Sequence, residues 1–349
     1  MAKSILHVAN CDNNLIPKYI NFVNERLNEY HNHTFLLLVE NDNDCYKEIE
    51  NVYTYNRCNN RKIIYIKDFI FDSIKSDKII LHGLFNINII LILFLMPWLL
   101  NKCYWVIWGG DLYNPQFAKK NWKWRLTEFF RRQVIKNMGN LVTYIKGDYD
   151  LAQQWYGAKG KYIECLMYTS NLYTKHYIPE KKHSSINIMV GNSADQMNNH
   201  FEIFYKLEQF IEQDIQIYVP LTYGNQEYAQ EVIAEGKKLF GDKFKPLTEH
   251  MPFEKYLEFL GLIDIAVFNH KRQQAMGNTI TLLGLGKKVF LRSDVSQWKF
   301  FKSHKIEVFD FMNLEIKLQD KQVKQHNSKI VKDYFSEEKF LQQLNGLFN

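Results

Sequence analysis

The sequence has few cysteines, and no pattern joins them into a site. The five cysteines are scattered as Cys11, Cys45, Cys58, Cys103 and Cys165, with no C-x-x-C pair among them. This spacing supports neither a structural zinc site nor a disulfide framework, and a reducing cytosol fits it best. Internal repeats are also missing, and a composition of 46% hydrophobic and 23% charged residues is that of an ordinary globular protein.

Long hydrophobic runs are missing as well. The N-terminal residues 1–14 carry too short an apolar run for a secretory signal peptide, and we expect them to begin a buried strand. The most apolar stretch, residues 84–100, contains Asn86, Asn88 and Pro97 and is short for a bilayer span, so it predicts a buried or interfacial helix. We therefore expect a cytoplasmic protein.

The sequence does contain the alternation of strands and helices that is typical of two α/β domains. The chain of 349 residues is long for one core, which favours two domains. In both halves short apolar segments alternate with longer helical ones, a pattern typical of parallel sheets covered by helices. A polar stretch at 178–185 is the linker candidate, so we predict domains at 1–180 and 181–349, with a cleft between them and a last helix that can pack back on the first domain. Strands are expected at 4–10, 34–40, 62–66, 78–85, 104–111, 140–147, 186–193, 215–221, 264–270 and 287–293.

The loops that follow these strands are the candidate binding segments, because open α/β sheets bind ligands beyond the carboxyl ends of their strands. In the first such loop of the second half, Gly191 and Asn192 permit close approach of the backbone, and Ser193 can donate a hydrogen bond to a phosphate. The same residues are also common in turns and caps that bind nothing. Both interpretations of this loop stay open.

A second loop, residues 268–278, is richer in groups that bind anions. Lys271 and Arg272 follow an apolar strand, and Gly277 and Asn278 precede an apolar helix whose first N–H groups are free. Arg272 can grip phosphate oxygens in a fork, Lys271 can act as a point charge, and Asn278 can cap the helix or touch the ligand. A diphosphate is the predicted ligand, with a solvated basic turn as the alternative.

A third loop, residues 219–224, places Thr222 and Tyr223 where they could meet a ribose or pack under a base. A turn shaped by Pro220 explains it equally well. Between these two loops, residues 245–252 could offer backbone groups to a pyrimidine, with Glu249 or His250 directed into the cleft.

Four strings in these segments carry a resemblance to a known family. VGNSADQMNNH, VPLTYG, FNHKRQQAMGN and LRSDVSQWKFF resemble bacterial transferases of 4-acetamido-4,6-dideoxygalactose (N-acetylfucosamine), which use a TDP-sugar and a polyprenyl-diphosphate-linked oligosaccharide. The likeness is strong over residues 186–310 and looser in the first half. It implies a GT-B fold, two facing Rossmann-like domains with the donor bound mainly by the second. By matching strings, donor contacts fall on Gly191, Asn192, Ser193, Lys271, Arg272, Gln274 and Asn278.

The resemblance further implies a glycosyltransferase in bacterial surface polysaccharide synthesis, such as that of enterobacterial common antigen or O-antigen, with the TDP-sugar as a substrate and no cofactor. Many retaining GT-B proteins have acidic residues near the phosphate loop, whereas this sequence has Gln273 or Gln274 and then Thr281. No D-x-D pair lies in a convincing loop at a strand end. We therefore expect Lys271, Arg272 and the helix terminus, not a metal, to neutralise the leaving group.

A general base, if the reaction inverts, should come from the first domain. Asp111 leads because it follows a strand and two glycines, which would place its carboxylate at the mouth of the cleft. A structural role as a helix N-cap is the alternative. His82 and Asp12, each at or just after a strand end, are further candidates, although a histidine there can simply be satisfied by backbone groups.

The segment 119–136 predicts contact with a membrane surface. Trp122, Leu126, Phe129 and Phe130 share one face at helical spacing, and basic residues surround that face against the single acid Glu128. A cationic helix with an aromatic apolar side fits a position on anionic lipid, which would bring the protein to a lipid-linked acceptor on the inner face of the membrane. The alternative is an ordinary helix packed on the sheet with its lysines in water.

Two other classes of function compete with sugar transfer. The net charge of +6 and the aromatic residues near Trp122 suggest a nucleic-acid-binding protein, but no nucleic-acid module is visible and the charge is confined to one stretch, so we expect no nucleic-acid partner. A sugar-binding partner without turnover is the second alternative. Release of TDP in the presence of donor and acceptor would separate this last possibility from a transferase.

Overall fold

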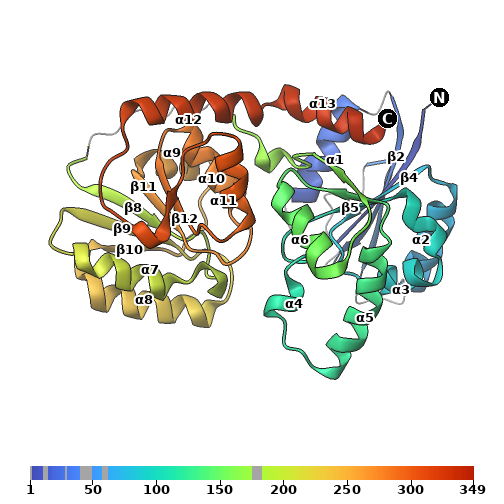
Figure 1. Cartoon of the computed structure of the whole chain (residues 1–349), viewed down its shortest axis with the longest axis horizontal. Coiled ribbons are helices and arrows are strands. Elements are labelled where there is room, and N and C mark those ends of the chain that lie inside the picture. Colours follow the sequence, from blue (N-terminus) through green and yellow to red (C-terminus); the bar gives the residue numbers. More distant parts are fainter. Residues whose placement is uncertain (1, 11–14, 28–29, 40–48, 57–61, 175–182) are drawn as a thin grey trace. The chain divides into compact units, whose positions relative to one another are not determined.

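The computed structural model describes residues 2–10, 15–27, 30–39, 49–56, 62–174 and 183–349. The chain divides into two compact units, one made of Met1–Ser170 and Glu337–Asn349 and the other of Asn171–Ser336 (Figure 1). The predicted division after residue 180 and most of the predicted linker lie in 175–182, outside the described residues. Each unit is a parallel sheet covered by helices, which confirms the predicted α/β class.

The first unit is built on a seven-stranded parallel sheet in the order β3-β2-β1-β4-β5-β6-β7. Its strands are β1 (Ser4–Asn10), β2 (Asn32–Val39), β3 (Val52–Asn56), β4 (Lys78–His82), β5 (Cys103–Val106), β6 (Asn140–Val142) and β7 (Lys161–Ile163). Its helices are α1 (Leu15–Arg26), α2 (Lys62–Lys75), α3 (Ile87–Leu95), η2 (Pro97–Lys102), α4 (Asn114–Phe117), α5 (Trp122–Lys136), α6 (Lys146–Tyr156) and α13 (Glu337–Phe348).

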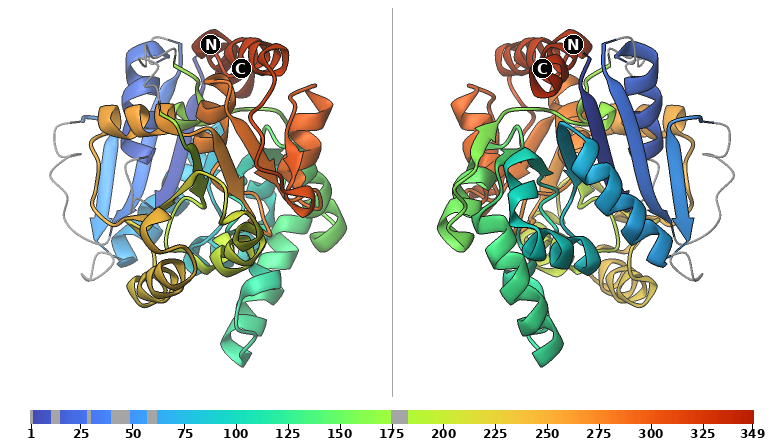
Figure 2. Two further views of the ribbon diagram at one scale, coloured as in Figure 1. Left: turned by 90° about the vertical axis from the view of Figure 1, so that its left-hand side faces the viewer. Right: turned by 90° about the vertical axis from the view of Figure 1, so that its right-hand side faces the viewer.

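The central strands of this unit are buried along most of their length because helices cover both faces of the sheet. Every residue of β4 is buried, and Leu81 joins Trp105 of β5 and Phe69 of α2 in one core cluster. The first turns of α5 and the short α4 extend away from that core (Figure 2). This position leaves much of the α5 surface uncovered.

One predicted strand of the first unit is wrong. Residues 62–66 are the first turns of α2, which runs on to Lys75. In this helix Tyr65 and Phe69, four residues apart, point to the core, while Ile63 is exposed. The five apolar letters resemble a buried strand, but the spacing of buried positions over the longer segment is helical.

The last helix of the chain belongs to the first unit. At the start of α13, Glu337 forms an ion pair with Arg26 at 3.0 Å. One turn later Phe340 packs against Phe22 with 5.0 Å between ring centroids and 34° between the ring planes. Near its end, the Nζ of Lys78 donates a hydrogen bond of 2.6 Å to the carbonyl of Leu347.

The second unit has a six-stranded parallel sheet in the order β10-β9-β8-β11-β12-β13. Its strands are β8 (Ile186–Val190), β9 (Ile215–Pro220), β10 (Phe244–Leu247), β11 (Ile265–Phe268), β12 (Lys288–Leu291) and β13 (Phe309–Asp310). Its main helices are α7 (His200–Leu207), α8 (Gln226–Phe240), α9 (Phe253–Leu262), α10 (Met276–Gly284), α11 (Ser296–Ser303) and α12 (Lys321–Tyr334). The short helical turn η4 (Gln196–Asn198) lies between β8 and α7.

Candidate functional site

The strand order of the second sheet reverses between β8 and β11, which lie side by side. Ligands of open α/β sheets bind at such a switch point, beyond the carboxyl ends of the strands. The loop after β8 holds Gly191, Asn192 and Ser193, and the loop after β11 holds Lys271 and Arg272. The fold therefore brings together the two loops that the sequence singled out.

Gly191 is required by the geometry of the first loop. Its φ is +66°, and a Cβ there would lie 2.7 Å from both the Oδ1 of Asn198 and the Nε2 of His200. Any larger residue would be strained in its backbone and would also push these two buried side chains apart. The loop can therefore run close to its neighbours, and to a ligand, only with glycine at this position.

Asn198 organises the same loop from beneath. It is fully buried, and its Oδ1 accepts hydrogen bonds from the backbone N–H of Asn192 at 2.9 Å and from the Nε2 of His270 at 2.8 Å. Its Nδ2 donates to the carbonyls of Ser193 and Asp195 at 3.1 and 3.0 Å. Asn198 thus links the loop after β8 to the loop after β11.

His270 takes part in this link as a neutral ring. Burial lowers the pKa of His270 to about 3, and the nearby Arg272 acts in the same direction. The neutral imidazole carries one N–H, and the contact with the Oδ1 of Asn198 assigns it to Nε2. Its Nδ1 has no hydrogen-bond partner among the described residues.

The second loop ends at a helix terminus suited to an anion. Ala275, the N-cap of α10, has a left-handed φ of +57°, and within the described part of the chain no side chain caps this helix. Its first N–H groups and the positive end of its dipole are therefore available to a negative ligand. Lys271 is exposed beside it, and the Nη2 of Arg272 lies 3.5 Å from the Oδ2 of Asp195, a loose contact that a phosphate could replace.

A polar cluster joins three more of the predicted contacts. The Nδ2 of Asn192 donates a hydrogen bond of 2.9 Å to the hydroxyl of Tyr223, and the Nε2 of Gln274 lies 3.4 Å from the Oδ1 of Asn192. Thr222 stands apart from this cluster, because its hydroxyl lies 3.4 Å from the carbonyls of Leu247 and Glu249. The roles of all these residues toward a ligand stay predictions.

Sequence reasoning missed Tyr256 and Gln297, which hold two of the predicted contacts. Tyr256 of α9 is hydrogen-bonded to Asn278, and the backbone N–H of Gln274 donates to the Oε1 of the buried Gln297 at 3.1 Å. Asn198 was missed in the same way. The adjacent pair Asn198–Asn199, just after the loop at the end of β8, is a sequence signal for a side chain that supports the loop. Only the fold shows that Asn198 is the buried one.

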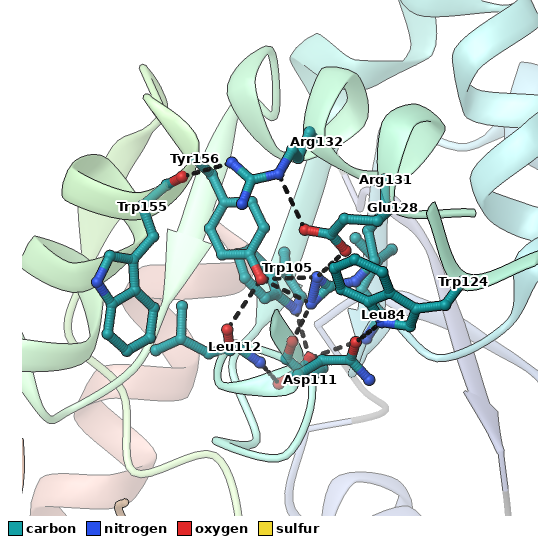
Figure 3. A network of polar contacts seen from close by, with 11 residues as sticks. Leu84, Trp105, Asp111, Leu112, Trp124, Glu128, Arg131, Arg132, Trp155 and Tyr156 are labelled. Carbon is teal, nitrogen blue, oxygen red and sulfur yellow. Dashed lines mark hydrogen bonds and ion pairs between the residues drawn. The ribbon is translucent and has the colours of Figure 1, made fainter. Parts of the chain in front are cut away.

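In the first unit, Asp111 has a side chain whose acceptors are already in use (Figure 3). It is 1% exposed, and its Oδ2 accepts from the N–H of Leu84 at 2.9 Å and from the indole of Trp105 at 2.7 Å. Its Oδ1 accepts from the N–H groups of Trp108 and Leu112 at 3.0 and 2.9 Å. This geometry is that of a turn organiser, and Asp111 would have to give up one of these bonds to take a proton from an acceptor. Its predicted role as a base stays a prediction.

His82 is in a similar position. It is buried, its Nε2 lies 3.1 Å from the Nδ1 of His7, and its Nδ1 lies 2.7 Å from the hydroxyl of Tyr168. Burial lowers the pKa of His82 to about 3. A histidine with both nitrogens engaged and so low a pKa is poorly placed to accept a proton, and its catalytic role also stays a prediction. Asp12 lies outside the described residues.

Helix α5 corrects part of the predicted membrane segment. Arg131 is buried, with a 3.4 Å ion pair to Glu128, a 2.8 Å hydrogen bond to the hydroxyl of Tyr156 and a contact to the carbonyl of Asp111 (Figure 3). Arg132 lies 3.1 Å from the other oxygen of Glu128. Arg131 is therefore not a surface cation, and Arg132, whose side chain is 43% exposed, is paired with the same buried carboxylate.

The apolar side of α5 is nevertheless exposed. Trp122, Leu126 and Phe129 are 70%, 53% and 54% exposed. Phe130 instead packs against the core cluster, and its ring centroid lies 4.9 Å from that of Phe94. Phe130 therefore does not belong to the exposed face. Exposed cations accompany that face at Lys119, Lys120, Lys123 and Arg125.

The described residues contain neither a metal-binding cluster nor a membrane-spanning helix. No group of three or more His, Cys, Asp or Glu side chains in these residues is arranged to hold a metal ion. None of the described helices has the length and apolar character needed to cross a bilayer.

Solved structures that resemble this one share its fold at low identity. The Anabaena protein Alr3699/HepE, in complex with UDP and glucose, is 10% identical with a TM-score of 0.67, and the match covers 99% of each chain. Sucrose-phosphate synthase from Thermosynechococcus elongatus is 11% identical with a TM-score of 0.68, over 99% of this chain and 98% of that one. WaaG, a glycosyltransferase involved in lipopolysaccharide biosynthesis, is 9% identical with a TM-score of 0.57, over 98% and 93%.

These neighbours confirm the predicted GT-B fold, with two Rossmann-like units. A family model described as 4-alpha-L-fucosyltransferase, glycosyl transferase group 56, matches residues 3–343. This match bears out the resemblance seen in the sequence and sets aside the alternative of a protein without turnover. The chain belongs to the group 56 family of 4-alpha-L-fucosyltransferases and is a glycosyltransferase.

Proposed function

We propose that the protein transfers a 4-acetamido-4,6-dideoxygalactosyl group, or a related deoxyamino sugar, from a TDP-sugar to a lipid-diphosphate-linked oligosaccharide in bacterial surface polysaccharide synthesis. The observation that carries the proposal is the switch point of the second sheet. There a glycine-bearing loop held by Asn198 faces the uncapped N-terminus of α10, with Lys271 and Arg272 beside it. The family match supports the class of sugar, and the resemblance of the loop sequences supports TDP.

The chemistry required of this site is stabilisation of a departing diphosphate. The bond between the sugar C1 and the β-phosphate oxygen breaks, with its electron pair left on the diphosphate. A bond forms between C1 and an acceptor hydroxyl, whose proton leaves to a base. The N–H groups of α10, Lys271 and Arg272 meet the charge that develops on the diphosphate, so no metal ion is needed for that step.

A thermal-shift panel of TDP, UDP, GDP and CMP tests the donor proposal, because a ligand at about 100 times its Kd raises stability by about 2.7 kcal/mol. TDP is expected to give the largest shift. Arg272→Ala and Lys271→Ala should shrink that shift, whereas Lys238→Ala, on the exposed side of α8, should leave it unchanged. A panel in which no nucleotide stabilises the protein would contradict the proposal, and a larger shift with UDP would overturn the assignment of TDP.

The second part of the proposal places the protein on the cytoplasmic, inner face of the cell membrane. The exposed face of α5, made of Trp122, Leu126 and Phe129, lies among Lys119, Lys120, Lys123 and Arg125. Aromatic and aliphatic side chains surrounded by cations suit the headgroup region of an anionic membrane, where a lipid-linked acceptor is found. The neighbouring α3 and η2 add exposed apolar groups, Leu95 and Trp98.

A further inference from the structure

The switch point of the first sheet, between β1 and β4, carries a small hollow that none of the proposed roles uses. None of its lining residues is charged. Asn86, one of the lining residues, caps α3, with its Oδ1 accepting from the N–H of Asn88 at 2.9 Å. The Nδ2 of Asn86 is buried and has no hydrogen-bond partner among the described residues. The lining residues are Val8, Ala9, Asn10, Tyr65, Leu81, Gly83, Leu84, Asn86 and Ile89.

Two aromatic rings form a corner beside this hollow. Phe85 is 47% exposed, and its ring meets that of Trp108 at 79° with 6.2 Å between centroids. Gly83 makes room for Phe85. A Cβ on Gly83, whose φ is +80°, would lie 2.4 Å from the Phe85 ring. The exposed position of this ring is therefore built into the backbone of the loop after β4.

Trp108 is fixed at both ends. Its backbone N–H donates to the Oδ1 of Asp111 at 3.0 Å, and its indole N–H donates to the hydroxyl of Tyr168 at 2.8 Å. Tyr168 is buried and packs edge-on against the indole ring, with 5.5 Å between centroids. The ring of Trp108 consequently has little freedom to rotate.

A row of buried histidines continues from Tyr168 into the core. The hydroxyl of Tyr168 lies 2.7 Å from the Nδ1 of His82, whose Nε2 lies 3.1 Å from the Nδ1 of His7. The Nε2 of His7 lies 3.0 Å from the Nδ1 of His33. All three rings are buried, and burial lowers the pKa of each, so each is neutral and has one donor and one acceptor.

The direction of this row follows from its first member. The indole N–H of Trp108 can only donate, so the hydroxyl oxygen of Tyr168 accepts and its own proton goes to the Nδ1 of His82. His82 then donates from Nε2 to His7, which donates from Nε2 to His33. The reverse direction would leave the buried O–H of Tyr168 without an acceptor in this row. The row thus fixes the tyrosine hydroxyl that holds Trp108.

We propose that Phe85 and Trp108 form a stacking site for a pyranose ring of the acceptor oligosaccharide. Tyr168, His82 and His7 are positioning residues that hold Trp108. The C–H face of a pyranose is apolar and matches an aromatic ring, and its hydroxyls need uncharged polar partners. The corner offers the aromatic face, and the Asp111 carboxylate beside it is fully bonded. This inference rests on the proposed transfer to an oligosaccharide.

The test uses methyl glycosides of glucose, galactose, mannose and N-acetylglucosamine at millimolar concentration with the full chain and TDP, followed by saturation-transfer NMR. At least one pyranoside should bind. Phe85→Ala should weaken that binding about tenfold, or about 1.4 kcal/mol. Phe71→Ala removes a phenylalanine of similar exposure on α2 and should leave binding unchanged. Equal binding by Phe85→Ala and the wild type, or no binding of any pyranoside to the wild type, overturns the inference.

A double-mutant cycle tests the positioning role. Tyr168→Phe should weaken pyranoside binding severalfold in the wild type but have little further effect in the Trp108→Phe background, because the hydroxyl acts through the indole N–H. Additive effects of the two changes would contradict that role. The thermal shift with TDP should be the same in all these variants. Loss of that shift in the wild type would instead refute the proposed function, so the two failures are distinguishable.

Discussion

The two sheets have the same strand order around their switch points, with β1 beside β4 in one and β8 beside β11 in the other. At the second switch point cationic groups are left free, with Lys271 exposed and Arg272 only 3.5 Å from its loose partner Asp195. At the first, the Asp111 carboxylate is saturated and the groups that remain accessible are aromatic. One topology therefore presents two chemistries, depending on which charges find a partner inside the protein.

In the first unit, buried charged side chains are paired inside the protein and are not available to a ligand. Arg131 and Glu128 are 5% and 6% exposed and are bonded to each other, to Tyr156 and to the turn that holds Asp111 (Figure 3). A buried charge is tolerated only when it is paired and hydrogen-bonded. In the second unit the corresponding turn uses neutral groups, Asn198 and His270, which hold the loop without competing for an anion.

Breaking the buried pair of the first unit should have the largest effect. Arg131→Ala leaves the Glu128 carboxylate buried with Arg132 as its remaining ion-pair partner and removes the contact to the Asp111 turn. We expect a loss of about 3–5 kcal/mol in the free energy of unfolding. Denaturant unfolding measures it, and Arg125→Ala, an exposed arginine on the same helix, is the matched control. A loss no greater than that of the control would show that this network is not structural.

Breaking the neutral support of the second unit should have the next largest effect. Asn198→Ala removes the acceptor of the Asn192 N–H and of His270, and leaves both buried donors unpaired. We expect a loss of about 2–3 kcal/mol in stability, together with a smaller thermal shift with TDP. Asn313→Ala, at an exposed asparagine of the same unit, is the control. A full TDP shift in a folded Asn198→Ala variant would separate this support from nucleotide binding.

The fold was predictable from the sequence in its centre and not at its edges. Nine predicted strands correspond to β1, β2, β4, β5, β6, β8, β9, β11 and β12, which are largely buried because each sheet is covered on both faces. The four strands at the ends of the two sheets, β3, β7, β10 and β13, were not predicted. They are short or mixed in polarity, and β10 contains Pro246, which an edge strand tolerates because one of its sides makes no ladder hydrogen bonds. Their pairing depends on a neighbour that the local sequence does not reveal.

The positions of Gly191 and of the cations beside α10 were predictable because these residue types have a narrow chemical use, while their contacts with a ligand stay predictions. The site was not predictable where burial decides. Arg131 reads as a surface cation and Glu128 as a lone acid, but their helical spacing of three places both on the inner side of α5, where they pair. His82 reads as a base at a strand end, and only its contacts with His7 and Tyr168 show it to be one link in a buried row.

Acid should weaken both units, a property that they share. Burial lowers the pKa of His33 to about 4 and that of His82 to about 3 in the first unit. In the second it lowers the pKa of both His200 and His270 to about 3. The unfolded chain binds these protons near pH 6.5, so stability is full above that pH and falls as pH decreases toward the folded values.

Each such histidine costs at most about 1.4 kcal/mol per pH unit in this window. Urea unfolding at about pH 7, 6 and 5 measures the slope, and this range lies above the usual pKa of carboxyl groups, so the decrease there reports the histidines. Stability that stays level over this range would show that the buried rings become protonated or exposed. If stability were lost in only one unit, the buried histidines would be a further difference between the two switch points.

The surface of α5 should give the smallest effect on stability and a clear effect on binding. Changing Lys119, Lys120, Lys123 and Arg125 to Ala alters exposed side chains only, so unfolding should shift by no more than about 0.5 kcal/mol. Each cation near an anionic bilayer contributes about 1 kcal/mol, so binding to vesicles that contain phosphatidylglycerol should weaken strongly and lose its dependence on salt. Removal of four exposed lysines of the second unit, Lys237, Lys238, Lys321 and Lys329, changes net charge equally and should leave vesicle binding nearly intact. If both quadruple variants weakened vesicle binding alike, overall charge and not the α5 face would hold the protein at the membrane. The exposed Trp122 and Phe129 of α5 would then have no role in membrane binding.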